Sequence, residues 1–518
     1  MSQFTVSLLR HLAARFDNTP VNHDNTLAGK SNAYDQKSRI RNPTNMIEKI
    51  FKAYDVRAVY PQPLNEEAAW KVGHATAQFL KRSREAFFPN IKVKHENTIV
   101  IGRDMRPSSP DLSKSLSDGI RSTGMNVIDV GMVDTSFIYF AANHLDCVGG
   151  IMNTASHNPI QYNGFKISGP KAKPIGSASG LDDIKRIATN LRVGHTGEQG
   201  TIETIDLWAE YRAHVLKFLD LKRPIKVAID ASNGMAGKMI PAVFGGVPNL
   251  TIVPILFEIN GSFTHEPNPL VESNLQMLKD LMHKNKDRGE PVDLGACFDG
   301  DADRCMFVDE TGNTIGCDHL TALLAKDFLS VPANKGATIV YDLRSSHSVI
   351  DAIKENGGVP KRERVGHTFF KKTLADTGAV FGGELSGHFY FRDNFNADSG
   401  AIAFARLLSV LSAQSGPLSG LIAPYKKYAQ TGEVNFEVED KDGKIRELAD
   451  AYKKGTIDYL DGITIELTDP VQGDWWFNVR KSNTEPLLRL NLECSSPKQL
   501  AEKFAEMKKH LGEPSHGH

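Results

Sequence analysis

Short apolar runs that end near an aspartate recur three times along the chain, at residues 98–104, 226–230 and 338–342. Each run is continuous and rich in β-branched residues, which is typical of a buried strand. A polar turn and a stretch with helical spacing follow each run. The interval between the runs is that of a domain and is too long for a solenoid repeat. The pattern therefore predicts three related α/β units.

Each unit also contains a second motif: a predicted strand, an irregular loop and a returning strand. The predicted strand pairs are 148–152 with 165–167, 294–298 with 305–308, and 379–381 with 389–391. The loops between them span 154–159, 299–304 and 382–388. Because the three loops lie at equivalent places in related units, we predict that they converge on one site.

Alternating strands and helices predict a mixed, mostly parallel sheet in each of these units. The pattern changes after residue 425, and the remainder is expected to form a smaller α+β domain. The expected divisions are a flexible N-terminal extension (1–44), three α/β domains (45–203, 204–315 and 316–427) and the C-terminal domain (428–518). An amphipathic targeting helix at residues 1–16 is the alternative reading of the extension.

Composition narrows the class of protein. The chain has 40% hydrophobic and 24% charged residues, and 61 Lys plus Arg balance 62 Asp plus Glu. Neither nucleic acid nor a membrane is therefore expected as a partner, and no apolar run reaches the roughly 20 residues that a membrane helix needs. Five widely spaced cysteines favour free thiols in a reducing compartment, so we expect a cytoplasmic protein.

The first loop offers a nucleophile. Ser156 lies between Ala155 and His157 on a segment that Pro159 keeps out of regular structure. On this loop alone, an ordinary turn is an equal alternative. The chain has no G-x-S-x-G elbow around Ser156, which excludes an α/β-hydrolase.

The second loop predicts a metal site. Asp299, Asp301 and Asp303 alternate along a tight turn, and carboxylates about 4 Å apart repel by about 4 kcal/mol per pair at an effective dielectric near 20. Oxygen-only ligands favour Mg²⁺ over zinc. A solvated turn is the alternative.

An EF-hand is rejected because Arg304 stands at the position where an EF-hand loop needs glycine. An aspartyl-phosphate enzyme is less favoured because Ser156 offers a nucleophile. Arg304 is suited to neutralise a phosphoryl group.

A turn near the C-terminus predicts a phosphate pocket. Arg480 supplies a planar fork of donors, and Ser482, Asn483 and Thr484 add short donors beside the backbone N–H groups of the turn. A polar turn between strands explains this segment equally well when it is taken alone. Residues 232–239 have the spacing of a Walker A loop but lack its first glycine and its final Ser/Thr, so we read them as a strand-to-helix turn.

As an ordered set, these segments resemble the α-D-phosphohexomutase superfamily, closest to its phosphomannomutase/phosphoglucomutase group. The matching segments are 154–159, 299–304, 383–388 and 480–486, and the resemblance runs from about Phe51 to Cys494. It implies three related α/β domains and a smaller C-terminal α+β domain, heart-shaped around a central cleft. It also implies an isomerase that interconverts hexose 6-phosphate and hexose 1-phosphate, of mannose, glucose or both.

The resemblance also implies roles for single residues. Ser156 corresponds to the phosphoserine, and together with Asp299, Asp301 and Asp303 to the ligands of one Mg²⁺ per active site. The implied catalytic residues are Ser156, His157, Lys166 and Arg304. The implied substrate-binding residues are Tyr54, Arg57, Arg344, Gly366, His367, Glu384, Ser386, Arg480, Ser482, Asn483 and Thr484. Ala58 departs from the glycine usual after the arginine of the Y-D-V-R segment.

The implied reaction passes through glucose or mannose 1,6-bisphosphate, which also serves as activator, and the implied partners are small-molecule sugar phosphates. A monomer or weak dimer is expected. Three alternatives remain: a phosphoglucosamine mutase, a phosphatase, and a catalytically silent relative that binds sugar bisphosphates. Leu385 and the S-N-T-E-P sequence of the last loop argue against the first of these.

Overall fold

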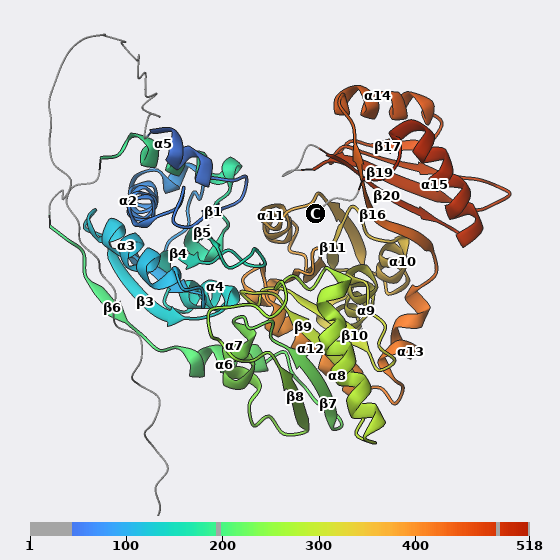
Figure 1. Ribbon diagram of the computed structural model, residues 1–518, viewed down its shortest axis with the longest axis horizontal. Coiled ribbons are helices and arrows are strands. Elements are labelled where there is room, and N and C mark those ends of the chain that lie inside the picture. Colours follow the sequence, from blue (N-terminus) through green and yellow to red (C-terminus); the bar gives the residue numbers. More distant parts are fainter. Residues whose placement is uncertain (1–43, 193–197, 483–486, 516–518) are drawn as a thin grey trace, which may run out of the picture. The chain divides into compact units, whose positions relative to one another are not determined.

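The computed structural model describes residues 44–192, 198–482 and 487–515, which form four sheets with their helices (Figure 1). The N-terminal extension expected from the sequence lies, up to residue 43, outside the described residues. A short helix, α1 (Thr44–Ile47), begins the described chain. Within the described residues, no helix combines the length and the apolar character needed to cross a membrane.

The first sheet has six strands in the order β1-β5-β4-β2-β3-β6. Its strands are β1 (Val56–Val59), β2 (His95–Arg103), β3 (Asn126–Met132), β4 (Cys147–Asn153), β5 (Tyr162–Ser168) and β6 (Ile202–Thr204). Its helices are α2 (Glu66–Arg82), α3 (Ser109–Arg121), α4 (Thr135–His144) and α5 (Leu181–Asn190). Strand β5 runs antiparallel to both β1 and β4, and the other neighbours are parallel.

The second sheet has the order β10-β9-β7-β8, and the third has the order β12-β11-β13-β14-β15. The strands of the second sheet are β7 (Ile225–Asp230), β8 (Leu250–Ile255), β9 (Leu294–Phe298) and β10 (Cys305–Asp309), with helices α6 (Trp208–Leu216), α7 (Ala236–Phe244) and α8 (Gln276–Asp287). Those of the third are β11 (Thr338–Asp342), β12 (Val359–Glu363), β13 (Phe381–Gly383), β14 (Phe389–Phe391) and β15 (Ala397–Asp398). Its helices are α9 (Cys317–Ser330), α10 (His347–Glu355), α11 (His367–Thr377), α12 (Gly400–Ser412) and α13 (Leu418–Ile422). The segment 232–239 is a turn leading from β7 into α7, as expected.

The C-terminal sheet differs from the other three because all of its neighbouring strands are antiparallel. Its strands, in spatial order, are β16 (Ala429–Glu437), β20 (Leu487–Cys494), β19 (Trp475–Lys481), β18 (Ile463–Leu467) and β17 (Thr456–Asp458). Two helices complete it, α14 (Lys441–Ala451) and α15 (Pro497–Leu511). The predicted fold class, three related α/β units and a smaller α+β domain, is therefore confirmed.

The aspartate that ends each of the three recurring runs makes the same turn. One side-chain oxygen of Asp104, Asp230 and Asp342 accepts the backbone N–H two residues further on, at 3.0, 2.8 and 2.9 Å. This contact closes the chain into a tight turn as it leaves the strand. The run that was recognised in the sequence is therefore a strand together with the turn that ends it.

The three chemistry-bearing loops connect equivalent antiparallel strand pairs, β4 with β5, β9 with β10, and β13 with β14. In each unit the first strand of the pair also belongs to the parallel part of its sheet. The prediction placed the third of these strands at residues 379–381, but β13 begins at Phe381 and ends at Gly383. Each loop follows the carboxyl end of a parallel strand, the edge at which α/β sheets bind ligands.

The packing inside the molecule needs close backbone approaches. At Gly73 of α2, a Cβ atom would lie 2.1 Å from the backbone oxygen of Leu116 in α3, so only glycine allows these two helices to approach as they do.

All five cysteines are buried and free. This agrees with the expectation of unpaired thiols.

Candidate active site

Ser156 is held in an uncommon backbone conformation. It follows β4 with φ 49°, in the left-handed region that L-residues seldom occupy, and it is buried. Its N–H donates to Thr154 Oγ1 at 2.9 Å, and the N–H of Asn158 donates to the oxygen of Ala155 at 3.0 Å. The loop is therefore a fixed turn that determines where the serine hydroxyl points.

Arg106, which the sequence analysis missed, fixes this loop from behind. Its side chain is fully buried, and its Nε donates to Asp104 Oδ2 at 3.1 Å. Its two terminal nitrogens donate to four backbone oxygens, those of Ser156 (2.8 Å), Asn158 (2.7 Å) and Pro159 (2.6 Å) in the serine loop and that of Tyr162 (2.9 Å) at the start of β5. Buried carbonyl groups need hydrogen-bond donors, and the Arg106 guanidinium group supplies them to these four. The position of this one side chain therefore holds the turn in its shape.

Three carboxylates form a buried cluster beside the serine. Ligand oxygens of Asp299, Asp301 and Asp303 lie within 4.8 Å of one another, and all three residues are buried. Ser156 Oγ donates to Asp299 Oδ2 at 2.7 Å, although 143 residues separate the two. The predicted meeting of the serine loop and the aspartate loop is therefore present in the structure.

The charges of this cluster are only partly compensated. Lys166 Nζ, from β5, lies 2.7 Å from Asp301 Oδ2 and 2.5 Å from Asp303 Oδ2. Burial, together with the charges of Asp301 and Asp303, raises the pKa of Asp299 well above its ordinary value. The Oδ1 atom of Asp301 is buried and has no hydrogen-bond partner among the described residues; that of Asp303 is also buried without a hydrogen bond there, but it lies 3.4 Å from His388 Nε2. Orphaned carboxylate oxygens in an oxygen-only set fit a divalent cation such as Mg²⁺.

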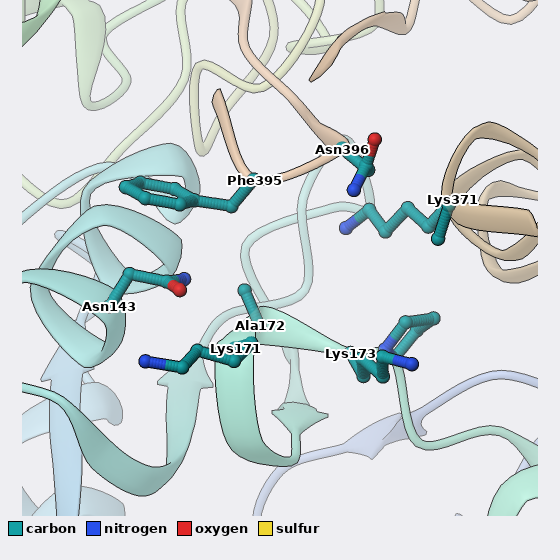
Figure 2. Close-up of a pocket in the computed structure, with 9 residues that line it drawn as sticks. Asn143, Lys171, Ala172, Lys173, Lys371, Phe395 and Asn396 are labelled. Atoms are coloured by element: carbon teal, nitrogen blue, oxygen red, sulfur yellow. The ribbon is translucent and has the colours of Figure 1, made fainter. Parts of the chain in front are cut away.

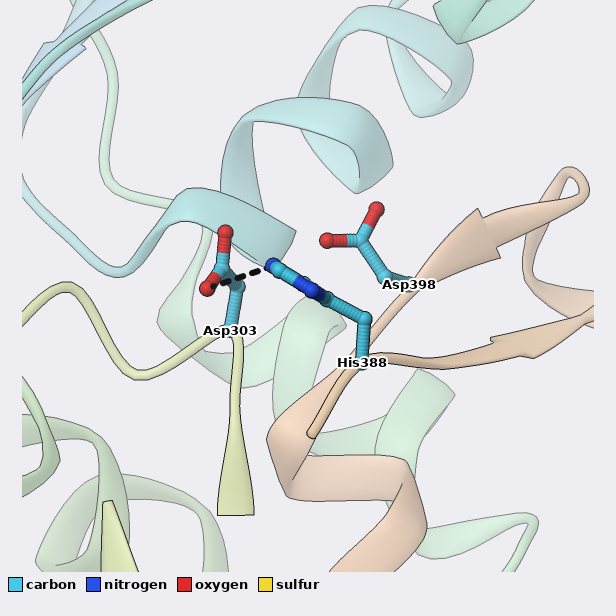
Figure 3. Close-up of side chains that lie close together, drawn as sticks. All are labelled: Asp303, His388 and Asp398. Atoms are coloured by element: carbon cyan, nitrogen blue, oxygen red, sulfur yellow. Dashed lines mark ion pairs between the residues drawn. The ribbon is translucent and has the colours of Figure 1, made fainter. Parts of the chain in front are cut away.

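Arg304, from the aspartate loop itself, and His388, from the loop of the third sheet, lie beside the cluster. Arg304 Nε lies 3.7 Å from Asp299 Oδ2 and 3.3 Å from His388 Nε2. Figure 3 shows the His388 ring between Asp303 and Asp398, with Nε2 of the ring 3.4 Å from Asp303 Oδ1. Asp398 in turn pairs with the buried Lys371 at 2.6 Å. His388 was not among the predicted site residues, although it stands in the loop that carries Glu384 and Ser386.

His157 is the ring nearest to the serine hydroxyl. Its Nδ1 lies 3.4 Å from Ser156 Oγ. Burial lowers its pKa well below the ordinary value, and the neighbouring charges of Arg304 and Arg57 lower it further. The imidazole is therefore neutral at pH 7 in this surrounding.

The N-terminal Y-D-V-R segment reaches the serine loop and the predicted substrate-binding pair Gly366 and His367. Arg57, on β1, donates to Asn158 Oδ1 of the serine loop at 2.7 Å and to Asp55 at 2.6 Å. The Tyr54 ring contacts the His367 ring edge-on, with centroids 5.8 Å apart, and borders Gly366. Ala58, where a glycine was expected, is a buried residue of β1 paired with Asn163, so regular strand geometry accommodates it.

The sugar-loop residues are held by their neighbours. Glu384 is buried, with Oε1 accepting the N–H of Gly366 at 3.0 Å and Oε2 accepting the Tyr390 hydroxyl at 2.8 Å. Ser386 Oγ lies 2.8 Å from His388 Nδ1. These contacts fix the Glu384 carboxylate while leaving further acceptor capacity on each oxygen.

Arg480 of the predicted phosphate pocket meets Arg344, a predicted substrate-binding residue, at a glutamate. Arg344, which follows β11, and Arg480, at the end of β19, both contact Glu433 Oε2, at 3.1 and 2.7 Å. The N–H of Ser482 donates to the oxygen of Leu487 at 2.9 Å. The other two predicted members, Asn483 and Thr484, lie outside the described residues.

The predicted site residues thus form two groups, and the sugar loop touches both. On one side Gly387 lies against Arg304, which belongs to the group around Ser156. On the other side the N–H of Leu385 donates to Asp342 Oδ2, at 3.1 Å, and the same carboxylate binds Arg344. The third sheet therefore connects the serine and metal loops with the arginine group.

A separate cavity of ≈ 210 Å³ contains none of the predicted site residues. Figure 2 shows Lys371 entering it from α11, opposite Lys171 and Lys173 of the segment after β5. Lys171 pairs with Asp146 at 2.5 Å and Lys371 with Asp398 at 2.6 Å. Because two of the three ammonium groups already have carboxylate partners, we assign no ligand to this cavity.

Comparison with known proteins identifies the family of the chain. All four domain models of phosphoglucomutase/phosphomannomutase match in order: α/β/α domain I at residues 48–193, domain II at 209–312, domain III at 317–428 and the C-terminal domain at 433–510.

Relatives and solved structures extend the match to nearly the whole chain. A phosphomannomutase of Escherichia coli is 35% identical over 86% of this chain and 94% of its own length. A phosphomannomutase/phosphoglucomutase of Pseudomonas aeruginosa is 35% identical over 87% of this chain and 93% of its own. The crystal structure of a phosphoglucomutase/phosphomannomutase family protein from Burkholderia thailandensis superimposes with a TM-score of 0.79 at 31% identity, covering 90% of this chain and 97% of that one. The chain belongs to the phosphoglucomutase/phosphomannomutase family and is a hexose phosphate mutase.

Proposed function

We propose that the enzyme interconverts hexose 6-phosphate and hexose 1-phosphate, of mannose, glucose or both, through a phosphorylated Ser156 and a 1,6-bisphosphate intermediate. The observation that carries this proposal is the position of Ser156 Oγ, 2.7 Å from Asp299 Oδ2 at the edge of a buried carboxylate cluster. A nucleophile whose backbone is fixed and whose oxygen faces potential metal ligands is suited to hold and release a phosphoryl group.

In the first step, the Oγ–P bond of phospho-Ser156 breaks while a new P–O bond forms to the free hydroxyl of the bound sugar phosphate. The hydroxyl proton passes to His157 Nδ1, 3.4 Å from Ser156 Oγ, and from there to the serine oxygen that leaves the phosphorus. The bisphosphate then turns end over end. Ser156 takes the other phosphoryl group, and the proton returns to the sugar oxygen. Serine is phosphorylated again, and the phosphate has changed its position on the sugar.

Charge on the moving phosphoryl group must be balanced at each step. Asp299, Asp301, Asp303 and the Ser156 oxygen would hold Mg²⁺, which neutralises negative charge on the group in transfer. Arg304, with Nε 3.7 Å from Asp299 Oδ2, adds a guanidinium at the same place. Lys166, already bound to two of the carboxylates, contributes a third cation from β5.

The remaining residues orient the sugar. Glu384, held by Gly366 and Tyr390, and Ser386, beside His388, are proposed to bind the 3- and 4-hydroxyls. Those hydroxyls exchange places when the ring turns over, so one loop serves both orientations. The non-transferring phosphate is proposed to bind Arg344, Arg480, Ser482, Asn483 and Thr484, with Tyr54, Arg57 and His367 bordering the sugar.

A substrate panel tests this proposal. Mannose 1-phosphate, glucose 1-phosphate and glucosamine 1-phosphate are each supplied with Mg²⁺ and a catalytic amount of hexose 1,6-bisphosphate, and the matching 6-phosphate is followed. We expect conversion of the mannose compound, the glucose compound or both, and slower conversion of the glucosamine compound. Parallel assays of inorganic phosphate separate a mutase from a phosphatase. If neither mannose nor glucose 1-phosphate is converted, the proposal is wrong.

A further inference from the structure

One carboxylate, that of Glu433, binds three arginines. Its Oε2 lies 3.1 Å from Arg344 Nη1 and 2.7 Å from Arg480 Nη2, and its Oε1 lies 2.9 Å from Arg489 Nη1. The three arginines come from different places: the turn after β11, the end of β19, and β20. Glu433 therefore joins the third sheet to the C-terminal sheet at the place where each supplies an arginine that we propose to bind phosphate.

The backbone is built to bring Glu433 to this position. Strand β16 shifts register against β20 between Gln430 and Glu433, which is a β-bulge, and Gly432 within it has φ 66°. A bulge bends a strand and turns the next side chain to a new direction. The hydroxyl of Thr431 accepts the N–H of Leu492 at 3.1 Å, which supports the irregular segment. Although the backbone at the bulge is exposed, the side chain of Glu433 is only 25% exposed.

Electrostatics explain why this position holds a carboxylate. Three guanidinium groups that share one small volume repel one another, and Arg480 is nearly inaccessible to water, with a side-chain exposure of 2%. Although burial raises the pKa of Glu433, the charges of Arg344, Arg480 and Arg489 lower it to about 2. Glu433 is therefore ionised at neutral pH and offsets part of the repulsion.

Donors remain for a ligand. Glu433 occupies one terminal nitrogen of Arg480, whose guanidinium group has five N–H donors, whereas Arg344 also donates from Nε and Nη2 to Asp342. Arg480 Nε is buried and has no hydrogen-bond partner among the described residues. Phosphate oxygens are suited to such paired, planar donors.

We propose that Glu433 is a positioning residue, which holds Arg344 and Arg480 at a fixed spacing so that together they bind the non-transferring phosphate of the substrate. This inference rests on the proposed function, because it takes Arg344 and Arg480 as phosphate-binding residues. Arg489 is the third arginine of this group and was not predicted from the sequence.

The test compares Glu433→Gln, which keeps the shape but removes the charge, with Glu433→Asp, which keeps the charge. We expect kcat/KM for the sugar phosphate to fall by between about tenfold and a hundredfold in Glu433→Gln, mainly through KM, because misplaced binding groups weaken productive binding. Glu433→Asp should recover part of the loss. Glu437→Gln, an exposed residue at the end of the same strand, is the matched control and should behave as wild type.

A second measurement separates positioning from a general effect on folding. Slow hydrolysis of the phosphoenzyme, followed as inorganic phosphate release without sugar, needs no second phosphate and should be unchanged in Glu433→Gln. If Glu433→Gln lost phosphoenzyme hydrolysis and sugar-phosphate turnover to the same extent, Glu433 would have only a structural role. A lower KM in Glu433→Gln would show that the carboxylate competes with phosphate. Either result overturns the proposal, whereas a wild-type enzyme that forms no phosphoenzyme would instead refute the proposed function.

Discussion

Replacing Ser156 by alanine should reduce mutase turnover by at least about 10⁴-fold, because the variant has no oxygen that can carry the phosphoryl group between the two sugar positions. The substitution removes the contacts of Ser156 Oγ with Asp299 Oδ2 and with His157 Nδ1, and leaves Arg106 and the backbone of the loop in place. Sugar phosphate binding should therefore persist while chemistry stops.

The measurement is initial-rate kinetics with the better substrate of the panel, together with equilibrium binding of the same compound. Ser330→Ala is the matched control, since Ser330 is an exposed residue at the end of α9 whose hydroxyl donates to the backbone oxygen of Asp327. Its activity should equal that of wild type. Substantial turnover by Ser156→Ala would mean that another group accepts the phosphoryl.

Replacing Arg106 by lysine should lower kcat by about a hundredfold. This is a large effect for a residue that does not contact the reacting atoms. An ammonium group cannot reproduce donation to Asp104 and to the four carbonyls in the serine loop and at the start of β5, so Ser156 loses its fixed place opposite Asp299. KM should change little, because the sugar and phosphate contacts belong to other loops.

Stability supplies a second readout for the same position. Arg106→Met leaves Asp104 and the loop carbonyls buried without their donor, and breaking a buried pair in this way costs about 3–5 kcal/mol of unfolding free energy. Arg103→Lys is the control, because Arg103 contacts the oxygen of Asp104 at 3.4 Å without reaching the serine loop. Wild-type kcat in a folded Arg106→Lys enzyme would contradict the assigned role.

The strands of the three related units were predictable because burial on both faces leaves a strong pattern. Residues 294–298 and 338–342 coincide with β9 and β11. The prediction failed by two residues at β13, where Gly382 and Gly383 suggested a loop. Gly383 instead pairs with Tyr341 and Phe389, and a Cβ there would lie 2.0 Å from Thr321 Oγ1 of α9, so this glycine serves helix packing.

The serine loop and the aspartate loop could be predicted from the sequence, because their chemistry depends on side chains that lie at fixed, short spacing along the chain. Arg106 and Glu433 could not, since their partners lie far away in the chain. Arg106 binds backbone oxygens about 50 residues distant, and a carbonyl group has no sequence signature. The single available signal was the repeated aspartate after each strand, because Asp104 and Asp342 each bind the arginine two residues later.

The measurement that tests the central claim most directly is mass spectrometry of the enzyme after incubation with hexose 1,6-bisphosphate, followed by a chase with hexose 1-phosphate. We predict one phosphoryl group on the peptide that contains Ser156, and its disappearance as sugar bisphosphate forms during the chase. A phosphoryl group on the Asp299–Asp303 peptide, or continued turnover by an enzyme whose Ser156 never carries phosphate, would contradict the account.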